Sequence, residues 1–125
     1  MEISNAQCLN EIREYTSDFE KIGQNDDGKF IDSLKVKLAE VDGVVYKGTI
    51  DASDNVVITK KVIGRGGYYF RLTTEKTDVY FIWHDRSLNK FIFWGEEYNV
   101  KQAMGVLNYR IKIVTQREEN PELRY

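Results

Sequence analysis

The residues able to carry acid–base, nucleophilic or metal chemistry are few in this sequence and poorly grouped. It has one histidine, His84, and one cysteine, Cys8, among 125 residues. One chain therefore cannot assemble a structural zinc site from the usual Cys and His ligands. No serine or cysteine stands at a local spacing that indicates a nucleophile paired with His84. We predict a protein without catalytic activity, bound metal or cofactor, and an enzyme with a carboxylate-based site stays open as an alternative.

The segment Gly64-Arg65-Gly66-Gly67 has the composition of an anion-binding loop. Glycines let backbone amides approach an anion closely, and Arg65 adds positive charge. A phosphate loop of the dinucleotide type opens a helix, however, and the residues that follow, YYFRLTT, favour a strand. We therefore interpret residues 64–67 as a tight turn between strands, with a contact to an anion or nucleic acid as the alternative.

Aromatic residues gather in one stretch of the chain. Ten of the sixteen lie between Tyr68 and Tyr98, and basic residues are spread among them. Aromatic side chains bury large areas, anchor interfaces and stack on flat partners, so the stretch indicates a core, a binding surface or both. Tyrosines beside arginines also suit stacking on nucleic-acid bases. The candidate binding residues are Arg65, Tyr68, Tyr69, Arg71, Trp83, Arg86, Lys90, Trp94 and Arg110.

Charge is divided along the chain. Residues 1–55 contain 12 acidic and 6 basic residues, whereas residues 56–117 contain 11 basic and 5 acidic ones, although the total charge is only -2. Such a division suits an anionic partner for the basic part. It equally suits mutual attraction of the two parts, within one molecule or between subunits.

The elements that position these residues follow from hydrophobic periodicity. Apolar residues spaced by three and four predict a helix over 5–22. From residue 33 the period changes to two, and Asp42-Gly43 is typical of a hairpin turn, which predicts an antiparallel sheet over 33–95. Turn-rich clusters divide it into strands at 33–39, 44–50, 55–63, 67–74, 78–84 and 90–95.

After the sheet we expect a helix over 97–108, a last strand over 109–115 and a frayed tail over 117–125. The predicted fold class is α+β: a single domain with a curved antiparallel meander of about six to seven strands. The N-terminal helix precedes this sheet, and the C-terminal helix comes before the last strand.

The strands 78–84 and 90–95 lack a polar face. Alternation places Phe81 and Trp83 on one side of the first strand and Ile82 and His84 on the other. Phe91 and Phe93 likewise alternate with Ile92 and Trp94, so both sides of this hairpin are apolar. The second side needs cover from this chain itself, from a second subunit or from a ligand, and all three alternatives stay open.

The start of the chain lacks the pattern of a secretion signal, and no run approaches about 18 apolar residues. We expect a soluble, cytoplasmic or otherwise intracellular protein that does not bind membranes. Its expected function is that of a small binding or interaction protein with a basic and aromatic sheet surface, which associates with itself or with another protein. The alternative is a nucleotide or nucleic-acid binder. The Ile, Lys and Asn usage also suits a phage or viral accessory protein that sequesters or blocks a host factor.

Overall fold

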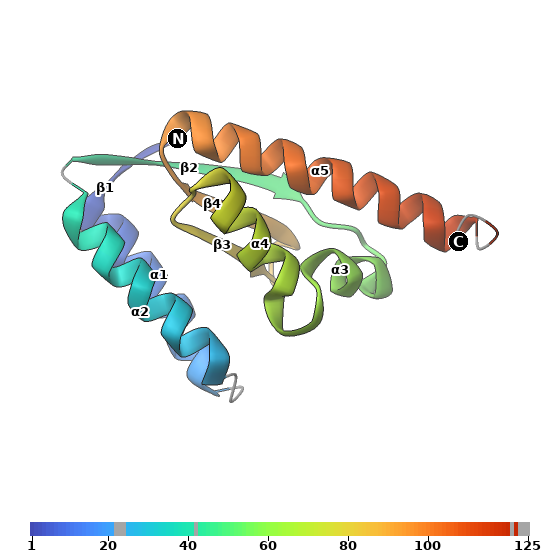
Figure 1. Ribbon diagram of the computed structural model, residues 1–125, viewed down its shortest axis with the longest axis horizontal. Coiled ribbons are helices and arrows are strands. Elements are labelled where there is room, and N and C mark those ends of the chain that lie inside the picture. Colours follow the sequence, from blue (N-terminus) through green and yellow to red (C-terminus); the bar gives the residue numbers. More distant parts are fainter. Residues whose placement is uncertain (22–24, 42, 121, 123–125) are drawn as a thin grey trace.

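The computed structural model describes residues 1–21, 25–41, 43–120 and 122, with the side chains of 16–21 and 25–32 left aside. Helices flank one antiparallel sheet (Figure 1), which confirms the predicted α+β class. In chain order the elements are β1 (Glu2–Ser4), α1 (Asn5–Lys21), α2 (Asn25–Glu40), β2 (Val44–Asp51), α3 (Val56–Ile63), the short 3-10 turn η1 (Arg65–Gly67), α4 (Tyr68–Thr77), β3 (Phe81–Asp85), β4 (Lys90–Gly95) and α5 (Glu97–Glu119).

The sheet has four strands in the order β1-β2-β4-β3, all antiparallel. The predicted hairpin of 78–84 with 90–95 is present, with Trp83 opposite Ile92. Strand β2 pairs with β4 through Gly48 and Phe93, and β1 lies at the other edge of β2. The prediction of six to seven strands is wrong, because four of the expected strands are helical.

The first correction concerns residues 33–39, which belong to α2 and do not form a hairpin with β2. Leu34 and Leu38 are buried, and Val36 between them is 63% exposed. A spacing of four fits one face of a helix as well as it fits alternate residues of a strand. The alternation was therefore ambiguous, and the exposed Val36 resolves it as helical.

The second correction concerns the expected strands 55–63 and 67–74, which are helices α3 and α4. The side-chain oxygen of Asn55 accepts a hydrogen bond from the Val57 amide at 3.0 Å and caps α3. In α4 the hydroxyls of Thr74 and Thr77 donate to the carbonyls four residues earlier, at 2.7 Å each. These bonds satisfy buried β-branched polar residues that we took as a sign of strands.

The third correction concerns residues 109–115, which continue α5 and form no strand. Val100, Ala103, Leu107 and Val114 are buried at helical spacing, so one face of α5 packs along its length. The helix also runs to Glu119, beyond the expected start of the tail at 117. Residues 121 and 123–125 of that expected tail lie outside the described residues.

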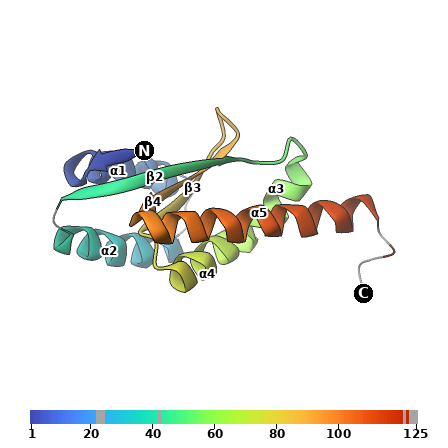
Figure 2. The same cartoon turned by 90° about the horizontal axis from the view of Figure 1, so that it is seen from above.

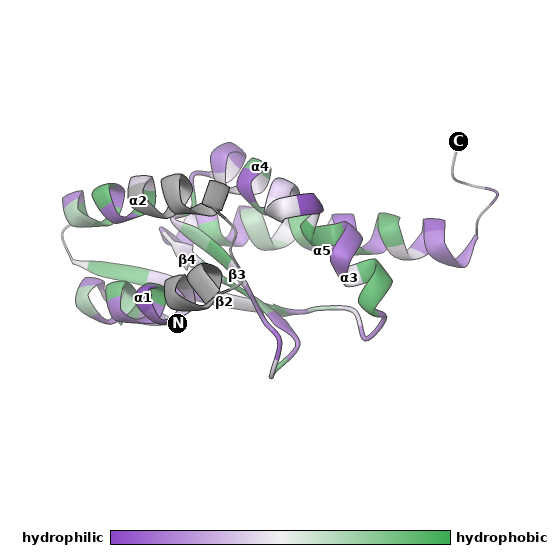
Figure 3. Cartoon of the chain, turned by 90° about the horizontal axis from the view of Figure 1, so that it is seen from below, coloured by the Kyte–Doolittle hydropathy of each residue, from purple (hydrophilic) through white to green (hydrophobic). Residues whose placement is uncertain are grey.

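Both faces of the sheet are covered by helices of the same chain. Ile82, Phe91 and Phe93 pack on one face against residues of α3 and α5. Phe81, Ile92 and Trp94 pack on the other face against residues of α1 and α2. Figures 2 and 3 show these two groups of helices around the strands, with apolar colouring along the strands in Figure 3. The predicted alternation is confirmed, and the second apolar side is covered internally.

Helix α1 agrees with the predicted helix 5–22 up to Lys21. Its predicted apolar face is confirmed at Cys8 and Ile12, which are buried in the core shared with α2 and the sheet. Residue 22 and the side chain of Phe19 lie outside the described part.

One glycine explains how closely α5 approaches the sheet. A β-carbon at Gly48 in β2 would lie 2.6 Å from Sδ of Met104 and 2.8 Å from Cγ1 of Val100. Any larger residue would push α5 away from the central strand, because packed interiors do not absorb added atoms without strain. Gly48 therefore fixes the position of α5 against β2.

None of the helices in the described ranges combines the length with the apolar content needed to cross a bilayer.

Candidate functional site

The glycine-rich segment 64–67 joins two helices and does not join two strands. Helix α3 ends at Ile63, and Gly64, Gly66 and Gly67 adopt φ angles of 82°, 61° and 76° before α4 begins at Tyr68. Positive φ is a conformation that glycine adopts without the steric penalty of a β-carbon. The expected strand after the glycines is thus a helix, and the reason we gave for preferring a plain turn is removed.

The first turn of α4 lacks a side-chain cap among the described residues, although the Tyr68 amide donates to the Arg65 carbonyl of η1. Gly67 is its N-cap residue, and no described side chain makes a capping hydrogen bond there. The N-terminus of a helix carries partial positive charge and exposes backbone donors. Arg71, one turn into α4, donates from Nη1 to the Gly66 carbonyl and keeps a second positive charge at the loop.

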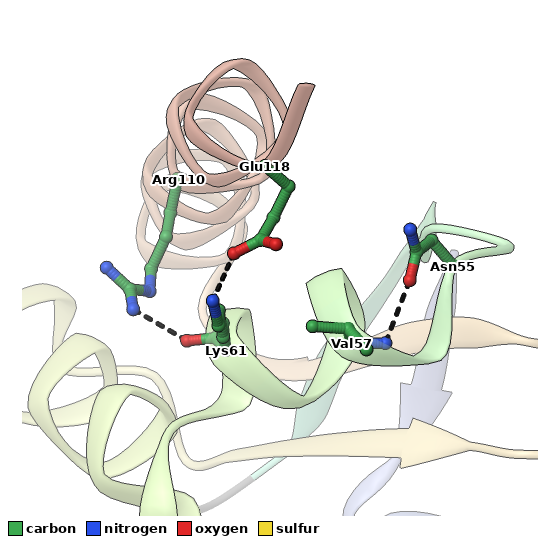
Figure 4. A network of polar contacts seen from close by, with 5 residues as sticks. All are labelled: Asn55, Val57, Lys61, Arg110 and Glu118. Atoms are coloured by element: carbon green, nitrogen blue, oxygen red, sulfur yellow. Dashed lines mark hydrogen bonds and ion pairs between the residues drawn. The ribbon is translucent and has the colours of Figure 1, made fainter. Parts of the chain in front are cut away.

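Arg110 of α5 holds the adjoining end of α3. Its Nε donates to the Val62 carbonyl at 3.1 Å, and one terminal nitrogen donates to the Lys61 carbonyl at 2.6 Å (Figure 4). Its guanidinium carbon also lies 3.2 Å from the ring centroid of Tyr69. Burial lowers the pKa of Arg110, and the neighbouring Tyr69 opposes this shift. Arg110 therefore fixes α3, α4 and α5 to one another.

A second contact joins α3 to the distal part of α5. Nζ of Lys61 forms an ion pair with Oε1 of Glu118 (Figure 4). Lys61 is thus neutralised by an ion pair within the chain, although both it and Lys60 beside it are exposed. Charge free for a partner comes from Lys60 and Arg65 more than from Lys61.

These residues form what we call the basic–aromatic corner: Lys60, Arg65, Tyr68, Tyr69, Arg71 and Arg110. Residues 56–77, which make up most of it, contain five basic residues and one acidic residue, Glu75. Arg65 is exposed, and Tyr68 is 52% exposed. The Tyr68 and Tyr69 rings meet edge to face with centroids 5.0 Å apart, and the Arg110 guanidinium lies against the Tyr69 ring.

The two tryptophans lie elsewhere, in the core between the sheet and α1. Trp94 is 0% exposed, and its indole nitrogen donates to Oε2 of Glu11 at 2.9 Å. Nζ of Lys47 lies 3.3 Å from the same carboxylate oxygen and 5.9 Å from the Trp94 ring centroid. This satisfied polar group lets a tryptophan be buried without an unpaired donor. The Trp94 side chain therefore serves the core and is covered from outside partners.

Trp83 is partly buried on the same face. Its ring lies 5.0 Å from that of Tyr15 and 6.0 Å from that of Phe81, measured between centroids. Helix α1 thus covers the aromatic side of the hairpin that we expected to present as a sheet surface.

Arg86 and Lys90 lie at the β3–β4 turn and apart from the contacts of the corner. Lys90 pairs with Asp51 of β2 at 3.6 Å, and Arg86 is exposed. The turn itself is held by Oδ1 of Asp85, which accepts from the Ser87 hydroxyl at 2.7 Å and from two backbone amides. These hydrogen bonds lower the pKa of Asp85, and the bond from the Ser87 hydroxyl makes the largest contribution.

The structure thus brings together Arg65, Tyr68, Tyr69, Arg71 and Arg110 and leaves the other four predicted residues elsewhere. Lys60 is the member of the corner that our candidate set omitted. Lys60 lies in the last turn of α3, directly before the glycine loop. Its place beside that loop can be predicted only when residues 56–63 are recognised as a helix.

Metal and thiol chemistry find little support in the described residues. No three His, Cys, Asp or Glu side chains there gather in an arrangement able to hold a metal ion. Burial raises the pKa of the Cys8 thiol to about 12, with a further contribution from Glu11. A thiol with such a pKa is protonated at neutral pH and is a poor nucleophile.

No family model, curated protein or solved structure matches this chain.

Proposed function

We propose that this protein is a non-enzymatic binding protein that holds single-stranded nucleic acid at the basic–aromatic corner. The observation that carries the proposal is the meeting of exposed cations and an exposed tyrosine on one solvent-facing corner, in a segment with five basic residues and one acidic one. Proteins that bind single strands combine positive charge along the backbone with aromatic rings for the bases.

The cations suit phosphate groups. Lys60 and Arg65 are exposed on consecutive elements, at the end of α3 and in η1, and Arg71 follows in α4. The N-terminus of α4 adds the partial positive charge of a helix end, although the amides of Gly64, Gly67 and Tyr68 already donate to carbonyls of this chain. Charges spread over three successive elements fit a chain of phosphates better than the phosphates of one nucleotide.

Tyr68 suits a base. Half of its surface is exposed, and its position is supported by the ring of Tyr69, which Arg110 holds in place. A base can stack on this ring only when it is unpaired, which favours a single strand over a duplex. Stacking on such a ring contributes about 1–3 kcal/mol for each base.

The test is the fluorescence anisotropy of labelled single-stranded oligonucleotides titrated with the protein. We expect binding whose affinity falls steeply as salt is raised, because phosphate contacts release counterions. The variant Arg65→Glu should lower affinity at least tenfold. Lys76→Glu is the matched control, since it makes the same charge change at the exposed far end of α4, roughly 12 Å from Tyr68 by the helical rise.

Tyr68→Ala separates stacking from general attraction. It should weaken binding about tenfold or more and leave the salt dependence unchanged, because it removes no charge. The proposal fails if wild-type protein shows no binding at low salt, or if Arg65→Glu and Lys76→Glu weaken binding equally. Equal affinity for inorganic phosphate and for the oligonucleotide would also overturn it, and would indicate a site for a small anion.

A further inference from the structure

Helix α5 carries an exposed seam on the side opposite its buried face. The seam consists of residues spaced alternately by four and three: Tyr98, Gln102, Gly105, Tyr109 and Lys112. Tyr98 is 70% exposed and Tyr109 66% exposed, and the other three residues are also exposed. Figures 1 and 2 show α5 along one outer side of the molecule, with no described element over it.

The spacing is that of the contact positions of two helices wound about each other. A repeat of four and three keeps one line of residues facing a partner helix over its whole length. On α5 this line runs for fifteen residues, or roughly 21 Å from Tyr98 to Lys112 by the helical rise. Single exposed apolar residues are common on protein surfaces. Two large exposed tyrosines on one line of a helix are instead grouped, and such grouping is typical of an interaction site.

Neither packing nor backbone conformation within the chain requires a glycine at position 105, the centre of the seam. A β-carbon added there would meet nothing within 4 Å, and its φ lies outside the range that favours glycine. A glycine in the interior of an exposed helix destabilises it by about 1 kcal/mol relative to alanine. Gly48 is explained by the approach of α5 inside the molecule, whereas Gly105 would allow an equally close approach from outside.

We infer that the seam of α5 binds the α5 helix of a second copy of this chain, antiparallel, with Gly105 of both copies at the two-fold axis. This symmetry places Tyr98 opposite Lys112 of the second copy and Gln102 opposite Tyr109 of the second copy. The first pair sets an ammonium beside an aromatic ring. In the second pair one hydrogen of the Gln102 amide bonds the Tyr98 hydroxyl of its own chain at 2.9 Å, and the other hydrogen lies beside the Tyr109 hydroxyl of the second copy. Each pair occurs twice, which makes the seam complementary to itself, as a two-fold contact requires.

The contact rests on surface outside the basic–aromatic corner. It is therefore independent of nucleic-acid binding, and either property can fail without the other. A single pair of helices buries less than the roughly 1,200–2,000 Å² of a standard interface, so we expect a weak dimer that forms with concentration.

The first experiment is sedimentation velocity of the full chain from roughly 1 µM to 1 mM, where interfaces of this size dissociate. We expect wild-type protein to shift from monomer to dimer. Gly105→Leu should stay monomeric throughout, because its side chain stands where the helices approach most closely. The same variant should not lower the melting temperature, since leucine has the higher helix propensity. Glu75→Leu, on exposed α4, is the control and should dimerise as wild type does.

The second experiment tests the symmetry by disulfide cross-linking under oxidation. Cys8 is the sole native cysteine and is buried, so an introduced thiol reports on its own position. Gly105→Cys should cross-link to a dimer, because the two copies meet at the axis. Lys101→Cys should not, because an antiparallel pair sets its two copies about 12 Å apart along the helices, beyond disulfide reach.

The inference is overturned by a wild-type chain that stays monomeric at the highest concentration, or by a Gly105→Leu variant that dimerises normally. Cross-linking of both cysteine variants would contradict the antiparallel arrangement. Cross-linking of neither would contradict a contact at Gly105.

Discussion

The aromatic stretch from Tyr68 to Tyr98 divides into two regions that use the same kind of side chain differently. In the β3–β4 hairpin, Trp94 is fully buried, and Glu11 accepts the hydrogen bond of its indole. At the basic–aromatic corner, Tyr68 is half exposed and is supported by Tyr69 and Arg110. The difference is one of cover: helices from this chain close over the first region and leave the second open. Aromatic content therefore indicates a binding surface only where the chain supplies no cover.

The largest expected effect is that of Trp94→Ala on stability. The substitution empties a buried site of the core and leaves the carboxylate of Glu11 without its indole donor. We expect a loss of about 3–5 kcal/mol in the free energy of unfolding, measured by urea titration. Trp83→Ala, at a partly buried site on the same face, should lose less. Equal losses would mean that Trp83 and Trp94 are buried to the same extent, which would contradict the difference in cover between them.

Arg110→Ala should have the next largest effect. It removes two hydrogen bonds to the end of α3 and the contact with the Tyr69 ring. We expect a loss of about 1–3 kcal/mol in the free energy of unfolding. The exposed Lys112→Ala, two residues away, is the control and should change stability by less than about 0.5 kcal/mol. An Arg110 variant as stable as this control would show that the corner does not depend on Arg110.

Cys8 gives a prediction about pH. Burial raises its pKa from 9.0 to about 12, so the folded state binds the thiol proton more tightly than the unfolded state does. This contribution to stability is complete below pH 9 and is lost as pH rises from 9 towards 12. Stability measured across this range should fall less steeply for Cys8→Ala than for wild type. Identical slopes would mean that Cys8 is accessible to water in the folded chain.

Tyr68→Ala should have the smallest effect on stability. Half of the side chain is already in water, so we expect a change within about 0.5 kcal/mol by urea titration. The same variant is expected to weaken oligonucleotide binding, which makes it the opposite of Trp94→Ala. A strongly destabilised Tyr68 variant would place Tyr68 with the core and remove the contrast between the two regions.

Elements with one dominant period could be predicted from the sequence. The helix 5–22 and the hairpin of 78–84 with 90–95 were found because their apolar residues fit one periodicity and turn residues bound them. Residues 33–39 and 109–115 failed because their apolar residues fit both two- and four-residue spacing. Burial against the sheet decides such cases, and it depends on residues distant in the chain.

The stretch 55–74 failed for a different reason. It is rich in Val, Ile, Thr and aromatic residues, which favour strands as isolated residues. Helices form there because Ile58 and Val62 pack against the sheet and α5, and because threonine hydroxyls bond to the preceding turn. The local signals were Asn55 as a cap and Gly64 after Ile63, and both were taken for turns between strands.

The candidate residues were predictable as chemical types and only in part as a group. Four of them lie within seven positions of the sequence: Arg65, Tyr68, Tyr69 and Arg71. Their proximity in space could therefore be predicted without knowing the fold. Arg110 joins them through a helical contact that the expected strand 109–115 could not supply. Trp83 and Trp94 were chosen for their size, which cannot distinguish a buried anchor from an exposed one.

The pairing of β2 with β4 has a consequence for the order of assembly. Asp85 and Lys90 pair across a short turn, whereas Gly48 and Phe93 pair across forty-five positions of the chain. Local hairpins form within microseconds, and distant pairs must first close a long loop. Helices α3 and α4 lie inside that loop, so the corner takes its final position only after β2 joins β4. Refolding rates should therefore respond to substitutions in β2 and be insensitive to exposed substitutions at Arg65 or Tyr68.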